Sequence, residues 1–470
     1  MIREPVEKPS SHADLIIKNG FLITLDPSRP LVEHGAIAVL GGRIAEIGDE
    51  RAISAAWRAP RVIDARGGAV HPGLIDAHNH VVHATCRGLF DGPQSASSTV
   101  TFADWKAGVN SEDEFIATQF ACLEMLRCGF TMFVEPGSAF DNDAVAAAAE
   151  SIGLRAMLAG CYVWDNVEAM RHLPSLGSQA LYDRSPPRLD RCLDRLGSEL
   201  YRNKNAEALV RGYVAVYGLG TASDDLLRAA HQLSREAGVV FQQHEGYLPE
   251  ATMVDRERLG HSRIRHLEDL GVLGPNSVLV HMNVMDDDDV NVLLKSQAQV
   301  IWCPSAHLQL GICRAPCRQP EFRARGGRLA LGTDGAMNCL IGDAGLCAYL
   351  MSANVQHPIS PGGILEMQTI NAASTIGLAH ELGSLEPGKR ADIVVRSPRA
   401  PEAFPGVNPV HQLALTCRAG TVDTVLVGGT VILRNGKPVL IDEEHVLADV
   451  RASVKRRMMR LELSATAYWK

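Results

Sequence analysis

Short apolar runs alternate with longer amphipathic stretches through the middle of the chain. Helical period marks several of the stretches between the runs, such as 113–129 and 224–238. Because the apolar runs are continuous rather than alternating, we expect both faces of each strand to be covered. Repeats of strand and helix predict an α/β fold, a (β/α)8 barrel of the TIM type. The eight predicted strands are residues 73–78, 130–136, 155–164, 212–220, 239–245, 277–283, 299–306 and 328–335.

The two ends of the chain have a different pattern, in which short strands are separated by turn dipeptides. NG dipeptides at 19–20 and 435–436 predict hairpins. We therefore expect a small β-sandwich built from both termini, with the barrel inserted between its parts. The predicted units are residues 1–70 and 384–441 for the sandwich, 71–383 for the barrel, and 442–470 for an amphipathic C-terminal helix.

The composition excludes several classes of protein. Of the 470 residues, 46% are hydrophobic and 21% charged, and the formal net charge of −8 argues against nucleic acid or an anionic membrane as a partner. No apolar run approaches the ~18 residues that span a bilayer. The eleven cysteines lack CxxC spacing, and the sequence begins without a signal peptide. We expect a cytoplasmic protein with reduced thiols that acts on a small molecule as a homodimer or higher homo-oligomer.

Histidines and an aspartate stand where predicted strands end. The sequence LIDAHNH places His78 and His80 two positions apart, so both imidazoles of a strand would point to the same side. His244 ends the fifth strand, His281 the sixth and Asp334 the eighth. Because the carboxyl ends of barrel strands gather at one mouth, these side chains should converge. Imidazoles with a carboxylate suit a divalent ion such as zinc.

Five motifs in this order, HPGLIDAHNHVVHATCRG, VHMNVMDDDDV, CPSAHLQLG, LGTDGAMN and GSLEPGKRADIVV, closely resemble those of the amidohydrolase superfamily. The likeness covers nearly the whole chain and is closest to the mononuclear cytosine-deaminase-like and triazine-hydrolase group. It implies one divalent ion, zinc first, with cobalt, manganese or iron as alternatives. The implied ligands are His78, His80, His244 and Asp334, with His281 as a further ligand or a partner of substrate and bound water.

The resemblance also implies catalytic roles. Asp334 would take a proton from the attacking water and hand it to the leaving group, and His281 would polarise the substrate. Dinuclear members of the superfamily need a carboxylated lysine at the end of the fourth strand, where this chain reads GYVAVYGLG. One ion per chain is therefore expected.

The fifth-strand motif departs from the ring deaminases of the superfamily. These carry a glutamate three places after the histidine, where this chain has Tyr247. Glu245 directly follows the ligand and, in strand geometry, should face away from the metal. Tyr247, Glu245 and His307 are candidates for substrate binding, although His307 would equally serve as a loop cap. His83 and Arg87, just past the HNH motif, would contact substrate or support the metal site.

Four functions stay open. The expected one is a metal-dependent hydrolase that cleaves an amide-like C–N bond of a small urea, carbamate or amide, like the phenylurea and thiocarbamate (molinate) hydrolases, because it needs no glutamate at position 247. An aminohydrolase acting on a ring amine is the alternative, with Tyr247, Glu245 or water replacing that acid. Chlorohydrolysis of a triazine is a third. A metal-free structural relative is disfavoured, because such members lose ligands and this chain keeps all five.

Overall fold

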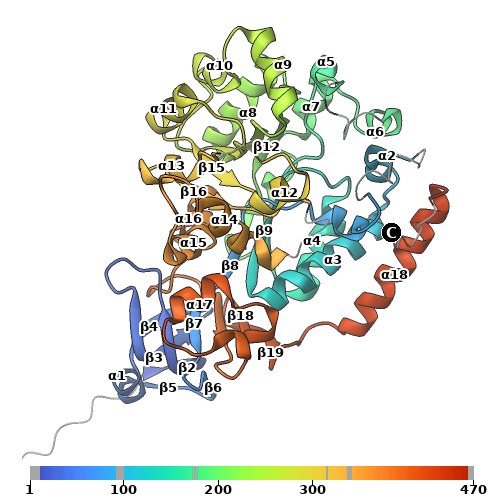
Figure 1. The fold of residues 1–470 in the computed structure, drawn as a ribbon. Helices are drawn as coiled ribbons and strands as arrows, with labels where there is room; N and C mark the ends of the chain where they lie inside the picture. Colours follow the sequence, from blue (N-terminus) through green and yellow to red (C-terminus); the bar gives the residue numbers. More distant parts are fainter. Residues whose placement is uncertain are drawn as a thin grey trace, which may run out of the picture.

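A barrel of parallel strands forms the centre of the molecule in the computed structural model, which describes residues 11–90, 100–171, 173, 176, 178–313, 316–335 and 341–463. Figure 1 shows the barrel with its helices above a β unit that combines the two ends of the chain. Each of the eight predicted strand regions contains a strand, so the predicted (β/α)8 barrel is confirmed. The barrel strands are β8 (Leu74–Asp76), β9 (Phe130–Glu135), β10 (Arg155–Leu158), β11 (Val210–Gly212), β12 (Val214–Gly218), β13 (Phe241–Glu245), β14 (Ser277–His281), β15 (Gln299–Trp302) and β16 (Leu329–Leu331).

Two arcs of strands close the barrel. One arc runs β8-β9-β10-β11 and the other β12-β13-β14-β15-β16. They join at Tyr213, whose N–H donates to the Leu158 carbonyl of the first arc. On the other side a parallel bridge links Asn79 to Asp334, directly beyond β8 and β16. The first and last barrel strands therefore meet at the residues predicted to bind metal.

Helices surround the barrel, and their sequences mark where they begin and end. The predicted helices at 113–129 and 224–238 are α3 (Ser111–Cys128) and α8 (Asp224–Ala237). Asn110 caps α3 by accepting from the Asp113 N–H, and Gly129 ends it with a φ of 90° that glycine adopts readily.

The other helices around the barrel follow in chain order. They are η1 (Val81–Cys86), α2 (Phe102–Ala107), α4 (Asn142–Ile152), α5 (Val167–Met170), α6 (Gln179–Arg184), α7 (Leu189–Arg195), η4 (Leu200–Lys204), α9 (Pro249–Leu259), α10 (Arg263–Asp269), α11 (Asp287–Ser296), α12 (Pro304–Gln309), α13 (Gln319–Ala324), η5 (Ile341–Asp343), α14 (Ala344–Ser352), α15 (Pro361–Met367) and α16 (Ile370–Thr375).

Strands from both ends of the chain form one continuous sheet with the order β20-β19-β18-β17-β7-β2-β3-β4, and β6 pairs with β2. Antiparallel pairing of Val70 with Val395 joins the N-terminal and C-terminal strands. The unit consists of β1 (Ser11–His12), β2 (Leu15–Ile23), β3 (Leu31–Leu40), β4 (Arg43–Asp49), α1 (Glu50–Ala56), β5 (Trp57–Arg58), β6 (Arg61–Asp64), β7 (Ala69–Pro72), β17 (Ile393–Arg396), η6 (Pro401–Ala403), α17 (Pro409–Leu415), η7 (Ala419–Thr421), β18 (Val422–Val427), β19 (Thr430–Arg434) and β20 (Lys437–Pro438). A β unit from both termini is thus confirmed, whereas the domain boundaries and the homo-oligomer stay predictions.

The two NG dipeptides have different outcomes. Asn435 and Gly436, with φ of 51° and 72°, form the predicted hairpin between β19 and β20. Asn19 and Gly20 instead lie inside β2, where the pairing register with β3 shifts, so the predicted hairpin there is wrong. The left-handed Asn19 makes a bulge and donates its N–H to Glu50 Oε2 at 3.0 Å, and the strand continues beyond it.

The C-terminal helix α18 (Glu443–Arg460) packs back on the barrel. Figure 1 shows it at the right of the molecule, beside α3. Ser453 donates to Asp113 Oδ1 at 2.8 Å, and the Arg457 guanidinium lies 3.7 Å from the centre of the Trp105 ring in α2. The helix therefore supports α2. Among the described residues, no helix has the length and apolar character needed to cross a bilayer.

Candidate metal centre and active site

Five polar side chains converge at the carboxyl end of the barrel. The His244 Nε2 atom lies 3.1 Å from Nε2 of His78 and 3.3 Å from Nε2 of His80. Asp334 Oδ1 lies 3.3 Å from His80 Nε2. His281 offers a ring nitrogen within 4.8 Å of those of His78 and His244. The predicted ligands are thus brought together in one cluster.

The tautomers of the two central histidines point their free nitrogens into this cluster. His244 Nδ1 lies 2.5 Å from the Tyr217 carbonyl oxygen, which only accepts, so the proton is on Nδ1 and Nε2 keeps a lone pair. His78 Nδ1 likewise lies 3.0 Å from Gln242 Oε1. Burial lowers the pKa of His78 well below its ordinary value and that of His244 to about 4, which keeps both rings neutral.

Neutral imidazoles whose lone pairs face one another at 3.1 Å repel unless a cation lies between them. Tetrahedral ligation at the usual zinc–nitrogen distance would place two ligand nitrogens about 3.3 Å apart. The spacing and the donor set, imidazoles with one carboxylate, therefore fit a divalent ion. His78, His80, His244 and Asp334 would hold it, with His281 beside them.

Backbone geometry fixes two of these side chains. His281 and Asp334 have positive φ of 78° and 58°, a left-handed conformation that non-glycine residues rarely adopt. The Asp334 N–H donates to the His78 carbonyl at 3.0 Å. Asp76 accepts from Thr333 Oγ1 at 2.5 Å and from Asn79 Nδ2 at 2.9 Å, which ties β8 to the segment carrying Asp334. The strained backbone at Asp334 is thus held by hydrogen bonds across the barrel seam.

Asp334 combines the features of a proton-transfer group. Burial raises its pKa to about 6, partly offset by the positive charge of Lys106 and a hydrogen bond from Tyr247. The Tyr247 hydroxyl lies 3.4 Å from Asp334 Oδ2, and the Tyr247 ring stacks on His281 with ring centroids 4.0 Å apart. A carboxyl whose pKa is near neutrality takes up and releases protons at working pH.

A cavity of about 270 Å³ opens over the cluster. Its described lining holds two charged side chains, Lys106 and Asp334, and much of the rest is apolar or aromatic. The residues that line it are His80, His83, Phe102, Lys106, Leu173, Tyr217, Leu219, His244, Tyr247, Leu248, His281, Ala306, Gln309, Leu310, Asp334 and Gly335. Apolar walls with a few convergent polar groups are typical of a small-molecule site.

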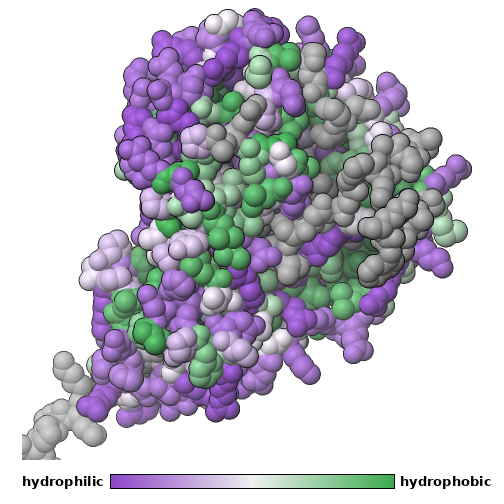
Figure 2. All heavy atoms as spheres, in the orientation of Figure 1, coloured by the Kyte–Doolittle hydropathy of each residue, from purple (hydrophilic) through white to green (hydrophobic). Residues whose placement is uncertain are grey.

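Apolar side chains continue from the cavity onto the surface. Leu308 and Leu310, at the end of α12, and Leu350 of α14 are exposed. Figure 2 shows apolar residues, in green, gathered in the middle of this face over α12 and α14. Because Leu310 also lines the cavity, the cavity opens beside an apolar surface.

Two of the predicted substrate-binding residues line the cavity and a third lies behind it. Tyr247 and His83 are in the wall, and His83 stacks on His80 with ring centroids 5.6 Å apart. His307 is fully buried outside the lining, with its ring centroid 5.5 Å from that of His281. Burial lowers the pKa of His307 to about 3, so its ring is neutral.

Arg87 and Glu245 lie outside the lining of this cavity, so the structure does not bring these two candidates for substrate contact to the cluster. Arg87 turns outward and pairs with Glu124 Oε2 at 2.9 Å. Glu245 points to the opposite side of β13 from His244, as strand alternation requires, and lines a separate small cavity with Arg263. Burial raises the pKa of Glu245 to about 8.

The sequence interpretation missed Gln242, Tyr217 and Lys106. Gln242 had a signal, because it lies two places before His244 and so faces the same side of the strand. Tyr217 acts through its backbone carbonyl, which no side-chain pattern reveals. Lys106 lies in a loop helix after the first strand, and its approach to the metal cluster depends on the path of that loop.

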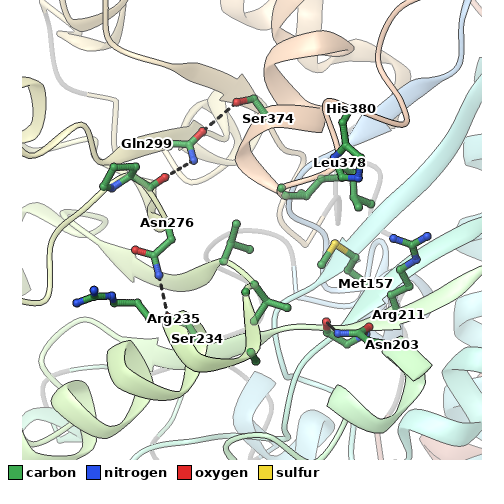
Figure 3. Close-up of a pocket in the computed structure, with 18 of the residues that line it drawn as sticks. Met157, Asn203, Arg211, Ser234, Arg235, Asn276, Gln299, Ser374, Leu378 and His380 are labelled. Carbon is green, nitrogen blue, oxygen red and sulfur yellow. Dashed lines mark hydrogen bonds between the residues drawn. The ribbon is translucent and has the colours of Figure 1, made fainter. Parts of the chain in front are cut away.

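A second cavity, of about 720 Å³, lies at the amino ends of the barrel strands (Figure 3). Gln299 at the start of β15 donates to the Pro275 carbonyl at 2.8 Å there, and Asn276 donates to Ser234. Among the described residues, the groups of side chains that could hold a metal ion lie instead at the carboxyl ends of the barrel strands. Since barrel enzymes carry out their chemistry at the carboxyl ends, the smaller cavity is the candidate active site.

Comparisons with known proteins agree with this geometry. Residues 69–432 match the model of the amidohydrolase family. The 5-methylthioadenosine/S-adenosylhomocysteine deaminase of Syntrophobacter fumaroxidans is 28% identical over 94% of this chain and 98% of its own. The 5'-deoxyadenosine deaminase of Methanosarcina acetivorans is 27% identical over 95% of this chain and 99% of its own.

Solved structures show the same fold. An adenosine deaminase from Xanthomonas campestris with bound zinc has a TM-score of 0.85 at 22% identity, covering 96% of this chain and all of the other. The atrazine chlorohydrolase of Arthrobacter aurescens TC1, complexed with zinc, has a TM-score of 0.79 at 23% identity, covering 94% of this chain and all of the other.

Proposed function

The chain belongs to the amidohydrolase family and is a hydrolase of C–N bonds, and from this premise we propose that it is a zinc-dependent aminohydrolase of a nitrogen heterocycle. In this reaction water adds to the ring carbon that bears an amino group, and the amine leaves as ammonia. The observation that carries the proposal is the cluster of neutral imidazoles around Asp334, in a chain aligned almost end to end with deaminases.

The donor set supports zinc. Three imidazole nitrogens and a carboxylate oxygen are the ligands that zinc prefers, and the structurally similar adenosine deaminase and chlorohydrolase contain zinc. A divalent ion held there would make water a strong nucleophile near neutral pH.

The side chains of this protein would carry the proton transfers. Asp334 Oδ2 would accept the proton of the attacking water and pass it on to the substrate, a role open to a carboxylate that lies beside the cluster and faces the Tyr247 hydroxyl. His281 would donate or accept a hydrogen bond at the ring nitrogen next to the reacting carbon, since its own ring nitrogens lie beside the cluster. The apolar walls would hold the heterocycle and exclude bulk water.

Tyr247 stands at the sequence position of the glutamate that protonates the ring nitrogen in ring deaminases. In this chain another group has to protonate that ring nitrogen. Burial raises the Tyr247 pKa well above its ordinary value, so the hydroxyl stays protonated. Its hydroxyl lies beside Asp334 Oδ2. We propose that Tyr247 orients Asp334 and substrate, while Asp334 moves both protons of the water. The first would pass to the ring nitrogen as the oxygen adds to the ring carbon, and the second, from the added hydroxyl, would pass to the amine, which leaves as ammonia while the C=O bond forms.

The comparisons favour an aminohydrolase over the urea or carbamate hydrolase expected from the missing glutamate. The two curated relatives are both named as deaminases. The chlorohydrolase likeness rests on the fold alone, so triazine dechlorination is the weaker alternative.

Product analysis on a substrate panel tests the proposal. The zinc-loaded protein would be offered adenosine, 5'-deoxyadenosine, cytosine and melamine, together with a phenylurea, a thiocarbamate and a chlorotriazine. We expect ammonia from at least one aminated ring and neither amine release from the urea nor chloride from the triazine. Asp334→Asn, which keeps the shape but not the basic oxygen, is the matched inactive control. Turnover confined to the urea or the thiocarbamate would overturn the proposal.

A further inference from the structure

Lys106 places a positive charge in the wall of the active-site cavity. The residue is 5% exposed, and its Nζ atom lies 4.6 Å from the centre of the Phe102 ring. It shares the cavity lining with His80, His244 and Asp334. Its charge also acts on these neighbours: it lowers the pKa of Asp334 and of His244.

Helix α2 holds Lys106 at this place. A reciprocal pair of hydrogen bonds between Thr101 and Asp104 caps its N-terminus. The buried Arg457 of α18 stacks on Trp105, the residue before Lys106, and donates to its carbonyl oxygen. The lysine is therefore presented by a segment fixed from both sides, which lowers the entropy lost when it binds a ligand.

A buried ammonium beside a divalent ion is costly, and a nearby negative charge offsets that cost. Asp334 is the acidic side chain of the described lining, and in the proposed reaction its oxygens serve the metal and the proton transfer. An ammonium has three N–H donors, so Lys106 can keep a contact within the protein and still donate to a bound molecule. The cavity thus combines apolar walls with a cationic end.

We propose that Lys106 is a specificity-determining residue that binds a carboxylate of the substrate. The inference rests on the proposed aminohydrolase function and narrows its substrate class to aminated heterocycles that carry a carboxylate on an apolar or sugar arm. The heterocycle would lie between the metal cluster and the leucines of the cavity wall, and the carboxylate would lie against Lys106. Neutral rings of the same size would bind less tightly.

A matched pair of compounds tests this assignment. Adenosine 5'-carboxylate and its neutral 5'-carboxamide differ in charge while keeping the same ring and amino group. For the zinc-loaded wild type we expect kcat/KM and Kd to favour the carboxylate by about tenfold to a hundredfold, the effect of one charge-assisted hydrogen bond. In Lys106→Met that preference should vanish, with the loss specific to the carboxylate falling mainly on KM. Because the lysine charge also acts on Asp334, kcat should change by a similar factor for both compounds, and the ratio of kcat/KM between the two compounds is the readout. Lys106→Arg should restore part of the preference.

The control variant is Lys455→Met, which removes one positive charge from the exposed face of α18 and should leave the preference intact. Equal losses on both compounds in Lys106→Met would give the lysine a structural role and overturn the inference. Binding measured by calorimetry separates the Lys106 assignment from the proposed aminohydrolase function, because binding needs no turnover. If neither compound releases ammonia but the carboxylate binds tightly in a Lys106-dependent way, deamination of the adenine ring fails and the lysine assignment stands. Absence of carboxylate binding by the wild type would overturn the lysine assignment.

Discussion

The Tyr247 hydroxyl lies 3.4 Å from Oδ2 of Asp334. Tyr247 stands three places after His244, where the motif that this chain resembles has a glutamate in ring deaminases. This contact joins the residue that departs from the deaminase motif to the residue proposed to move protons. The Asn283 side chain also donates to the Tyr247 carbonyl at 3.1 Å, so the position of Tyr247 is fixed by the segment that follows the neighbouring strand β14.

Replacing Tyr247 by Phe should slow the enzyme without stopping it. The variant loses one hydrogen bond to Asp334 but keeps the ring that stacks on His281. We therefore expect kcat/KM to fall roughly tenfold, which corresponds to a loss of about 1–2 kcal/mol in transition-state stabilisation. Steady-state ammonia release, with zinc content measured in parallel, checks this. Complete loss of turnover with zinc retained would instead make Tyr247 the acid of the reaction.

Chelation should remove activity, and zinc, cobalt or manganese should restore it, with about one ion bound per chain. His78→Ala and Asp334→Ala should each lose both the ion and turnover, because the remaining donors cannot complete a tetrahedral shell. Elemental analysis of the purified variants checks this, with His380→Ala, an exposed histidine far from the cluster, as the control. Two tightly bound ions in the wild type would refute the mononuclear site.

Removing the acceptor behind His78 should weaken zinc binding. Gln242→Leu leaves His78 Nδ1 without its amide oxygen partner, and we expect zinc affinity to fall by about 10- to 100-fold. Competition with a chelating dye measures it. The neighbouring Gln243→Leu is a matched control, since its side chain points to the other face of β13 and should leave affinity unchanged.

Protonation of Glu135 should couple stability to pH. Burial raises the pKa of this carboxyl from 4.5 to about 7, although it accepts from the Gly137 N–H at 2.7 Å and from Ser138. Between pH 4.5 and 7 the folded chain therefore binds more protons at this site than the unfolded chain. The free energy of unfolding should fall across that window as pH rises.

The variant Glu135→Gln isolates this effect, because it keeps an acceptor but cannot ionise. Relative to wild type, its free energy of unfolding should rise by up to about 3 kcal/mol between pH 5 and pH 8. Urea unfolding at both pH values measures it, and Glu250→Gln, at the exposed start of α9, controls for net charge. A difference that stays constant with pH would contradict the assignment.

The barrel and the convergence of most of the candidate metal ligands were predictable because both depend on local patterns. Apolar runs locate the strands, and parallel strands bring their carboxyl ends together whatever the loops do. His244 and His281 are therefore placed by strand ends alone, and the outward direction of Glu245 follows from the two-residue period of a strand.

Loop residues escaped prediction because their positions depend on packing between distant segments. Lys106 reaches the cavity only because α18, more than 300 residues away, fixes α2 through Arg457 and Trp105. Arg87 was a candidate either for substrate contact or for support of the metal site because it follows the HNH motif closely, and in the structure it pairs with Glu124. The NG dipeptide at 19–20 was misleading for a related reason: a left-handed residue serves a bulge as well as a turn.

The seam between β8 and the segment after β16 has a consequence for biosynthesis. Asn79 and Thr333, which are hydrogen-bonded across it, lie 254 residues apart in the chain. During translation the first two histidines emerge from the ribosome long before Asp334, so a nascent chain holds only part of a chelating site. With the proposed zinc site, tight uptake of the ion would begin only when the last strand has docked against the first. The ion would then stabilise completed barrels in preference to partly folded chains, which are more open to proteases.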